Sequence, residues 1–193
     1  MGAVTAILLF LLGLVIIVLL VGMRTFKHLA QVRHNFTQAR SEIDALIQQR
    51  HDELTQLVKI CKQFMKSEQA TLEKVMEARD AVARARQIAD LGALGRAETR
   101  LRTSLGSLLA VAEAYPELRT SEKFQHLQIR VSGLENAIAE RRAFYNASVN
   151  INNERIEQFP DLVLARLFDF KPQPLLEFSE EETRDVNMRE LYS

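Results

Sequence analysis

The side chains that most often carry chemistry are few and scattered in this sequence. Histidine occurs at four positions, and no two of them are four residues apart, so the paired histidines of a helical zinc site are missing. The single cysteine, Cys61, excludes an internal disulfide, and its apolar neighbourhood predicts a small buried hydrophobe. Acidic pairs such as Glu180 and Glu182 lie near the chain end, where no cleft is expected. We therefore expect no catalytic residue, no metal and no cofactor, and a protein that is not an enzyme.

Three polar residues interrupt otherwise apolar rows: Arg50, Arg141 and Asn152. A buried arginine is costly unless a carboxylate pairs with it. One interpretation is that these residues form a polar core that fixes helix register and orientation. The alternative is a functional cluster, in which Arg50, His51, Asp52 and Arg141 bind an anion or a partner. We favour the first interpretation, and Arg50→Met tests it, since unchanged helix pairing and stability would contradict it.

The elements that would position these residues begin with an apolar segment. Residues 1–23 carry no charged side chain, and the run at 3–21 is long enough to cross a hydrocarbon core of roughly 30 Å as a helix. A cleaved signal peptide fits poorly, because no basic residue precedes the run and no small-residue cleavage site follows it. Basic residues follow the run and none precedes it, which predicts an outside N-terminus and a cytoplasmic remainder. These residues are Arg24, Lys27, Arg33 and Arg40.

A very long helix is predicted beyond the membrane. Residues 24–90 contain neither glycine nor proline, and one helix of that length extends for about 100 Å. Apolar residues recur along it in a heptad-like stripe, which predicts shallow packing against other helices. The LGALG stretch at 91–95 then predicts an interhelix turn. The stripe comprises Leu29, Phe36, Ile43, Leu57 and Phe64, with Ile47, Leu54 and Cys61 beside them.

The rest of the chain predicts shorter helices, each ended by a proline or a turn. They cover about 97–115, 121–158 and 161–169. The predicted fold is therefore all-α, with an N-terminal transmembrane helix continuing into a long antiparallel helical bundle of three to four helices. Its domains would be the anchor at 1–23, the bundle at 24–172 and an acidic, disordered tail at 173–193. The sequence leaves open which half of the long helix the shorter helices cover.

The segment 161–170 is strongly apolar for its position near the chain end. We expect a short helix docked on the bundle, or alternatively one at the membrane surface with its aromatic rings among the headgroups. In either case it is an interaction surface. Its candidate residues are Leu162, Leu164, Leu167, Phe168 and Phe170.

Four segments of the sequence resemble segments of a known protein family. They are IQQRHDEL at 47–54, AEAYPEL at 112–118, LENAIAERRAFYNASVNINNERIEQFP at 134–160 and LFDFKP at 167–172. Together they resemble the LemA family of bacterial membrane proteins over nearly the whole chain. The resemblance implies an N-terminally anchored antiparallel helical bundle, and it supplies no catalytic residues. The family commonly places Leu-Ile-Pro-Asn-Leu after Arg-His-Asp, whereas this chain has no proline there, so we expect an uninterrupted first helix.

These observations favour a non-enzymatic, single-pass scaffold of the LemA type in the bacterial inner membrane, acting in envelope or membrane organisation. Some members of the family resemble proteins of bacterial organelle membranes. The expected partners are membrane lipids and further copies of the chain, because a long helix paired with short ones would leave apolar stripe uncovered. The alternative is an adaptor or regulator of a membrane enzyme such as an envelope protease. The zero net charge argues against a nucleic-acid partner.

Overall fold

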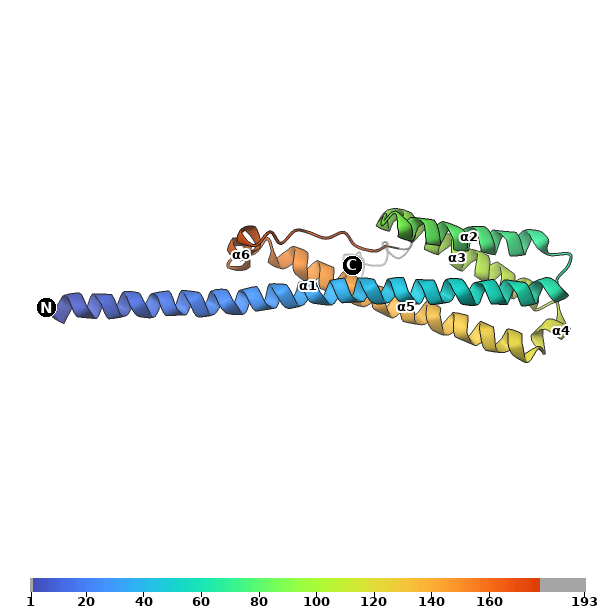
Figure 1. The fold of residues 1–193 in the computed structure, drawn as a ribbon, viewed down its shortest axis with the longest axis horizontal. Helices are drawn as coiled ribbons and strands as arrows, with labels where there is room; N and C mark the ends of the chain where they lie inside the picture. Colours follow the sequence, from blue (N-terminus) through green and yellow to red (C-terminus); the bar gives the residue numbers. More distant parts are fainter. Residues whose placement is uncertain (1, 178–193) are drawn as a thin grey trace, which may run out of the picture. The chain divides into compact units, whose positions relative to one another are not determined.

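The computed structural model describes residues 2–177, and within them it contains helices and no strand, as the all-α prediction requires (Figure 1). The predicted tail at 173–193 lies mostly outside the described residues. The helices, in chain order, are α1 (Gly2–Phe64), α2 (Gln69–Gln87), α3 (Leu91–Ala112), α4 (Pro116–Arg119), α5 (Glu122–Arg155) and α6 (Asp161–Leu167).

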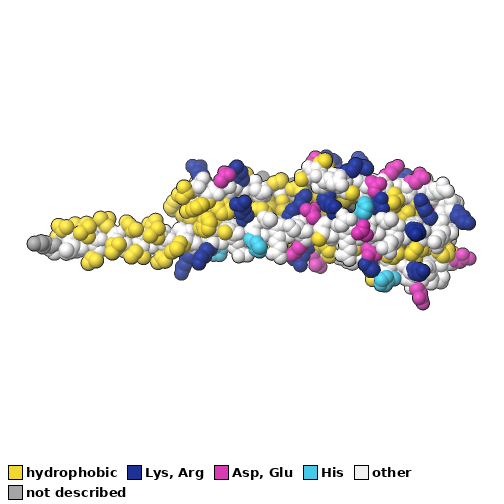
Figure 2. Space-filling model, viewed as in Figure 1, with side chains coloured by type: hydrophobic (Ala, Val, Ile, Leu, Met, Phe, Trp, Pro, Cys, Tyr) yellow, Lys and Arg dark blue, Asp and Glu magenta, His cyan; other side chains and the backbone are white. Residues whose placement is uncertain are grey.

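The first part of α1 has the properties of a membrane span. It contains an 18-residue window with a mean hydropathy of 3.4, and none of that window is buried by other parts of the chain. Figure 2 shows hydrophobic side chains covering this part of the helix without a protein partner. Such a surface is stable when lipid surrounds it, because hydrocarbon then replaces water around the apolar side chains.

The prediction of one helix over 24–90 was wrong, because α1 ends at Phe64 and α2 follows after a short turn. The helix is unbroken through residues 53–57, where the family's proline is missing. No glycine or proline marks the turn at 65–68; tertiary packing supplies it instead. Met65 is fully buried there, and the turn lets a second apolar row on α2 pack into the interior. Burial of that row offsets the helical hydrogen bonds lost at the turn.

The predicted turn at 91–95 was also misplaced. The chain turns at 88–90 instead, where Ala89 has a φ of 55°, and both glycines of LGALG lie within α3. The Asp90 side chain accepts a hydrogen bond from the Ala93 amide, so a capping residue starts the helix ahead of the glycines. Gly95 is buried.

The described chain forms two compact units. The first contains residues 2–38 and 144–174, so it combines the apolar stretch with the end of α5, α6 and the segment that follows α6. The second contains residues 39–143 together with 175–177, and within it α2 and α3 pack on each other. Most of the heptad-like stripe of α1 is buried within the chain: Leu29, Ile43, Ile47, Leu54, Leu57 and Cys61 are all at most 2% exposed, and Phe36 and Phe64 are half-buried. The expectation that this stripe stays open was therefore wrong.

Candidate functional site

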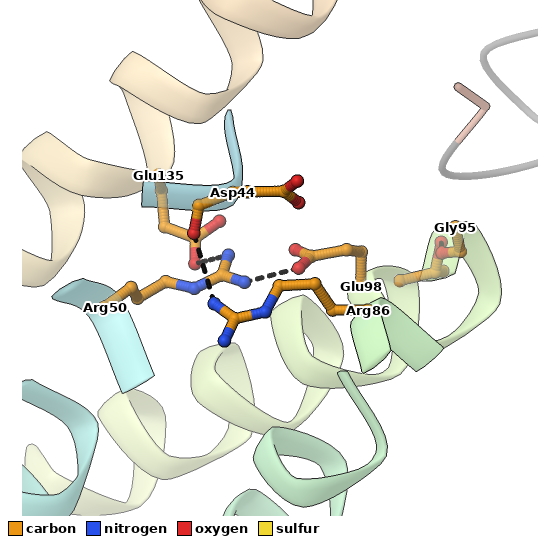
Figure 3. Close-up of polar contacts among 7 residues, drawn as sticks. Asp44, Arg50, Arg86, Gly95, Glu98 and Glu135 are labelled. Carbon is orange, nitrogen blue, oxygen red and sulfur yellow. Dashed lines mark hydrogen bonds and ion pairs between the residues drawn. The ribbon is translucent and has the colours of Figure 1, made fainter. Parts of the chain in front are cut away.

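The largest fully buried side chain is an arginine at the centre of the second unit. Arg50 on α1 is 1% exposed, and its guanidinium donates to Glu98 of α3 at 2.5 Å and to Glu135 of α5 at 2.7 Å (Figure 3). The two carboxylates favour the charged form and raise the pKa of Arg50, although burial alone would lower it. One cation thus joins three helices through charge-assisted hydrogen bonds, the strong class of such bonds.

A second arginine extends this network toward α2. Arg86 donates to the backbone carbonyl of Asp44 at 3.1 Å and to the side chain of Gln48 at 2.6 Å, so it also ties α2 to α1. Figure 3 shows its guanidinium beside that of Arg50. Glu53, one turn along α1, is buried and pairs with Arg130 of α5. These contacts fix how the helices of this unit align.

The space beside Arg50 is too small for a ligand. The cavity lined by Arg50, His51, Arg86 and their neighbours has a volume of about 10 Å³, roughly the room that one water needs. His51 lies at its edge, where partial burial and the nearby Arg79 cation lower its pKa. With its guanidinium committed to two carboxylates and no room beside it, Arg50 has the geometry of a structural residue.

Arg141 does not belong to this buried group, so its prediction as a core residue was wrong. It is exposed and pairs with Glu42 at 3.0 Å. Glu42 precedes Arg50 by eight residues on α1, a separation of about 12 Å along the helix. The alternative cluster of Arg50, His51, Asp52 and Arg141 is therefore not brought together. A long arginine side chain at an apolar register position can reach the surface, and here it does so.

Asn152 is 1% exposed and acts in the first unit as one half of an asparagine pair. Its Nδ2 donates to the carbonyl of Lys171 at 3.1 Å. The neighbouring Asn153 forms two hydrogen bonds with the backbone of Gln173. Its Nδ2 donates to the Gln173 carbonyl and its Oδ1 accepts from the Gln173 amide, each at 2.8 Å. Tyr145 completes the set by donating to the carbonyl of Pro174 at 3.0 Å. We call Tyr145, Asn152 and Asn153 the polar clamp, since α5 uses them to hold the extended backbone after α6.

Sequence reasoning singled out Asn152 but missed Tyr145 and Asn153. The signal was present, because all three lie in the stretch at 134–160 that resembles the family, and Lys171 lies in the LFDFKP stretch. The structure connects the two stretches: the first carries the three side chains, and the backbone that they bind begins at Lys171 in the second stretch and continues beyond it to Pro174. An amide side chain suits this task because it donates and accepts at once.

The interaction candidates near α6 divide into two groups. Leu164 and Phe170 pack on the cluster formed by Leu29, Ile156 and Ala165. Phe168 contacts Phe26 of α1 with ring centroids 4.7 Å apart, yet it remains 48% exposed, and Leu167 is 71% exposed. Leu162 is half-buried. One face of the segment is therefore docked within its unit and another faces outward.

Metal-binding geometry is not found in the described part of the chain. Among residues 2–177, no three side chains of histidine, cysteine, aspartate or glutamate are placed to share an ion. Cys61 is fully buried, and burial raises the pKa of its thiol to about 11, which disfavours the thiolate that metal binding and nucleophilic attack require.

Comparison with known proteins agrees with the family resemblance noted in the sequence. The LemA family model matches residues 39–189. Two curated relatives are magnetosome proteins MamQ 2 and MamQ 1 of Paramagnetospirillum magneticum, each 33% identical over 87 residues, which is 44% of this chain and 32% of the relative. Magnetosome protein MamQ of Magnetospirillum gryphiswaldense is 32% identical over 68 residues, covering 35% of this chain and 25% of the relative. The match thus spans about a third or less of each relative's length. With its apolar first helix and this family match, the chain is a membrane-associated protein that belongs to the LemA family.

Proposed function

We propose that the protein is a non-enzymatic helical scaffold that is anchored in the bacterial inner membrane and self-assembles to organise that membrane. The observation that carries the proposal is α1, a single helix that includes both the apolar stretch and the buried Arg50. The buried charges Arg50, Glu53 and Glu98 are held in internal ion pairs, and the cavity beside Arg50 is too small for a ligand. Such an interior is suited to rigidity and not to chemistry.

The surface proposed for self-assembly lies on α5. Phe144 and Ile151 are each 45% exposed, and a spacing of seven residues places them on the same face of the helix. Large exposed apolar side chains on one helix face suit contact with a second copy. We propose this surface in place of the heptad-like stripe of α1, which is mostly buried within the chain.

The relatives give the proposal its biological direction. They are named magnetosome proteins, and we take this name, together with the apolar stretch of α1, as support for a role at a bacterial membrane. The basic residues Arg24 and Lys27 directly after the apolar stretch support a cytoplasmic bundle. A C-terminal green fluorescent protein should therefore fluoresce, whereas a C-terminal alkaline phosphatase should be inactive; the reverse pattern would contradict this topology.

Mass photometry of the full-length protein, extracted in mild detergent at its native expression level, tests self-assembly. We expect a discrete species much larger than the 22.0 kDa chain, and we expect Phe144→Ser combined with Ile151→Ser to reduce it to a single chain. Ile88→Ser is the matched control, since Ile88 is a large exposed side chain outside this face. A wild-type protein that stays a single chain would contradict the scaffold. A single chain joined to one unrelated protein would favour the alternative role, an adaptor or regulator of a membrane enzyme.

A further inference from the structure

A second apolar surface lies on the outer face of α6. Val163 and Leu167 are 56% and 71% exposed and lie four residues apart, the spacing of one helix face, and Phe159, which is 83% exposed, directly precedes the N-cap residue Pro160 of this helix. Phe168 adds an exposed ring beside them. We call these four residues the outer α6 face. The opposite face of the same helix, with Leu164 and Ala165, is already packed on Leu29 and Ile156.

The position of α6 along the axis of α1 is set by contacts inside the first unit. Phe168 lies against Phe26, and Phe26 also lies 6.3 Å from Phe170. Further along α1, Arg33 stacks over Phe170 at 5.9 Å. The chain after α6 therefore runs away from the apolar stretch, so α6 is held at the end of the unit that is next to it. Figure 2 shows a dense hydrophobic area at this end of the unit, where the apolar stretch stops.

This position of α6 corresponds to the headgroup layer of the bilayer that the apolar run would cross. Phe26 comes five residues after Val21, the last residue of the apolar run, which is a distance of about 7 Å along the helix. The headgroup layer on each side of a bilayer is roughly 5–8 Å deep. Apolar faces of interfacial helices are buried at this depth, at the boundary between headgroups and acyl chains.

The charges around α6 fit the same environment. Arg24 and Lys27 on α1 and Arg166 on α6 are exposed, and within the described residues none of them has an ion-pair partner. Of the nearby acids, Asp161 and Asp169 are each paired with a neighbouring cation, and Glu157 is exposed. Unpaired cations beside an apolar face are the pattern of a surface that contacts anionic lipid headgroups.

From these observations we propose that the outer α6 face inserts into the interface of the same bilayer that α1 crosses, so that the chain contacts the membrane at two points. The occupant of this surface is lipid and not a second protein chain. The second contact point would fix the tilt and rotation of α1 in the membrane, because a helix with one anchor can rotate freely about its axis. This inference holds whether or not the protein self-assembles.

The chain contains no tryptophan, so a single introduced tryptophan reports on one position. Leu167→Trp is to be reconstituted as the full chain into phosphatidylcholine–phosphatidylglycerol vesicles, with and without brominated acyl chains. We expect its emission to be shifted to the blue and to lose most of its intensity in the brominated vesicles. Val15→Trp, within the apolar run, should be quenched at least as strongly. If it is not, the chain does not cross the bilayer and the proposal fails with that premise.

Ile129→Trp is the matched control, since Ile129 is also 71% exposed. Its neighbour Arg130 pairs with Glu53, which is 32 residues beyond Val21 on α1, so we expect no quenching there. Leu167→Trp emission that is no more quenched than that of Ile129→Trp would overturn the proposal. A blue-shifted emission that brominated lipid leaves unchanged would overturn it as well, because protein and not lipid would then cover the residue. Circular dichroism of each variant checks that the helices are intact.

Discussion

Arg50 and Glu98 form an ion pair of 2.5 Å in which both side chains are at most 3% exposed, 48 residues apart in the chain. Glu135 adds a third charge from another helix. A buried cation with two carboxylates is a demanding arrangement, because each charge loses its hydration and only the partners replace it. It makes the alignment of α1, α3 and α5 specific, since a shift of any one helix along its axis would leave a charge in the interior without its partner.

Replacement of Arg50 should therefore be strongly destabilising. Arg50→Met leaves Glu98 buried without a cation, and we expect the free energy of unfolding to fall by about 3–5 kcal/mol. Arg141→Met is the control, because its pair with Glu42 is solvent-exposed and should contribute no more than about 1 kcal/mol. Denaturant unfolding of the full chain in detergent, followed by circular dichroism, measures both. Equal losses in the two variants would contradict the structural role of Arg50.

Removal of the whole ionic group tests whether it serves stability or register. In Arg50→Met with Glu98→Leu and Glu135→Leu, no charge is left unpaired, so we expect most of the loss to be recovered. If the group fixes register, the recovered protein should show broader amide resonances or more than one helix pairing in cross-linking. A triple variant with one sharp, native pairing would show that the apolar contacts alone determine the alignment.

His51 should make the protein more sensitive to acid. Burial and the Arg79 cation hold its pKa below the ordinary value of 6.5, so the unfolded chain binds a proton more readily than the folded chain does. Stability is then complete above about pH 6.5 and is lost as the pH falls through the lowered pKa. We expect His51→Gln to flatten the dependence of the melting temperature on pH between these two values. An unchanged dependence would assign the acid sensitivity to other groups.

Cys61 should be unreactive while the protein is folded. Its side chain is fully buried, and the pKa of its thiol is raised to about 11, so almost no thiolate exists at neutral pH. A maleimide should therefore label the native protein very slowly and the denatured protein quickly. A single cysteine makes the readout direct by mass spectrometry. Rapid labelling without denaturant would mean that α1 separates from its neighbours at this point.

The polar clamp should control the segment after α6. Asn153→Ala removes the acceptor of the Gln173 amide, and a net loss of about 1 kcal/mol corresponds to about fivefold faster exchange of that amide. Asn150→Ala is the matched control, because Asn150 is exposed on the same helix. Hydrogen exchange with mass spectrometry on peptides covering 170–176 compares the two. Equal exchange would show that the segment is held by its apolar contacts and not by the clamp.

Much of the fold followed from patterns that depend on local chemistry. An uncharged apolar run predicts a membrane-compatible helix because no backbone group inside it lacks a partner. Seven-residue spacing predicted most of the buried face of α1, and the prolines were correctly predicted to limit the helices before them, since α3 ends ahead of Pro116 and α5 ends ahead of Pro160. Arg50 and Asn152 were also predicted from local chemistry, since a polar residue within an apolar row is buried on folding and then needs a hydrogen-bonding partner.

Other features were decided by tertiary structure alone. The reversal at 65–68 contains neither glycine nor proline, so the gain from packing α2 on the interior places it there. The partners of Arg50 lie 48 and 85 residues away, and no local pattern selects Glu98 and Glu135 among the 25 acidic residues. Arg141 lies at a heptad position of the predicted core, yet its side chain is exposed, because a long arginine side chain can extend from such a position to the solvent. The sequence by itself determined which residues require burial or pairing, through hydrophobicity and charge; the tertiary structure decided which groups meet, because those pairings depend on how distant segments pack.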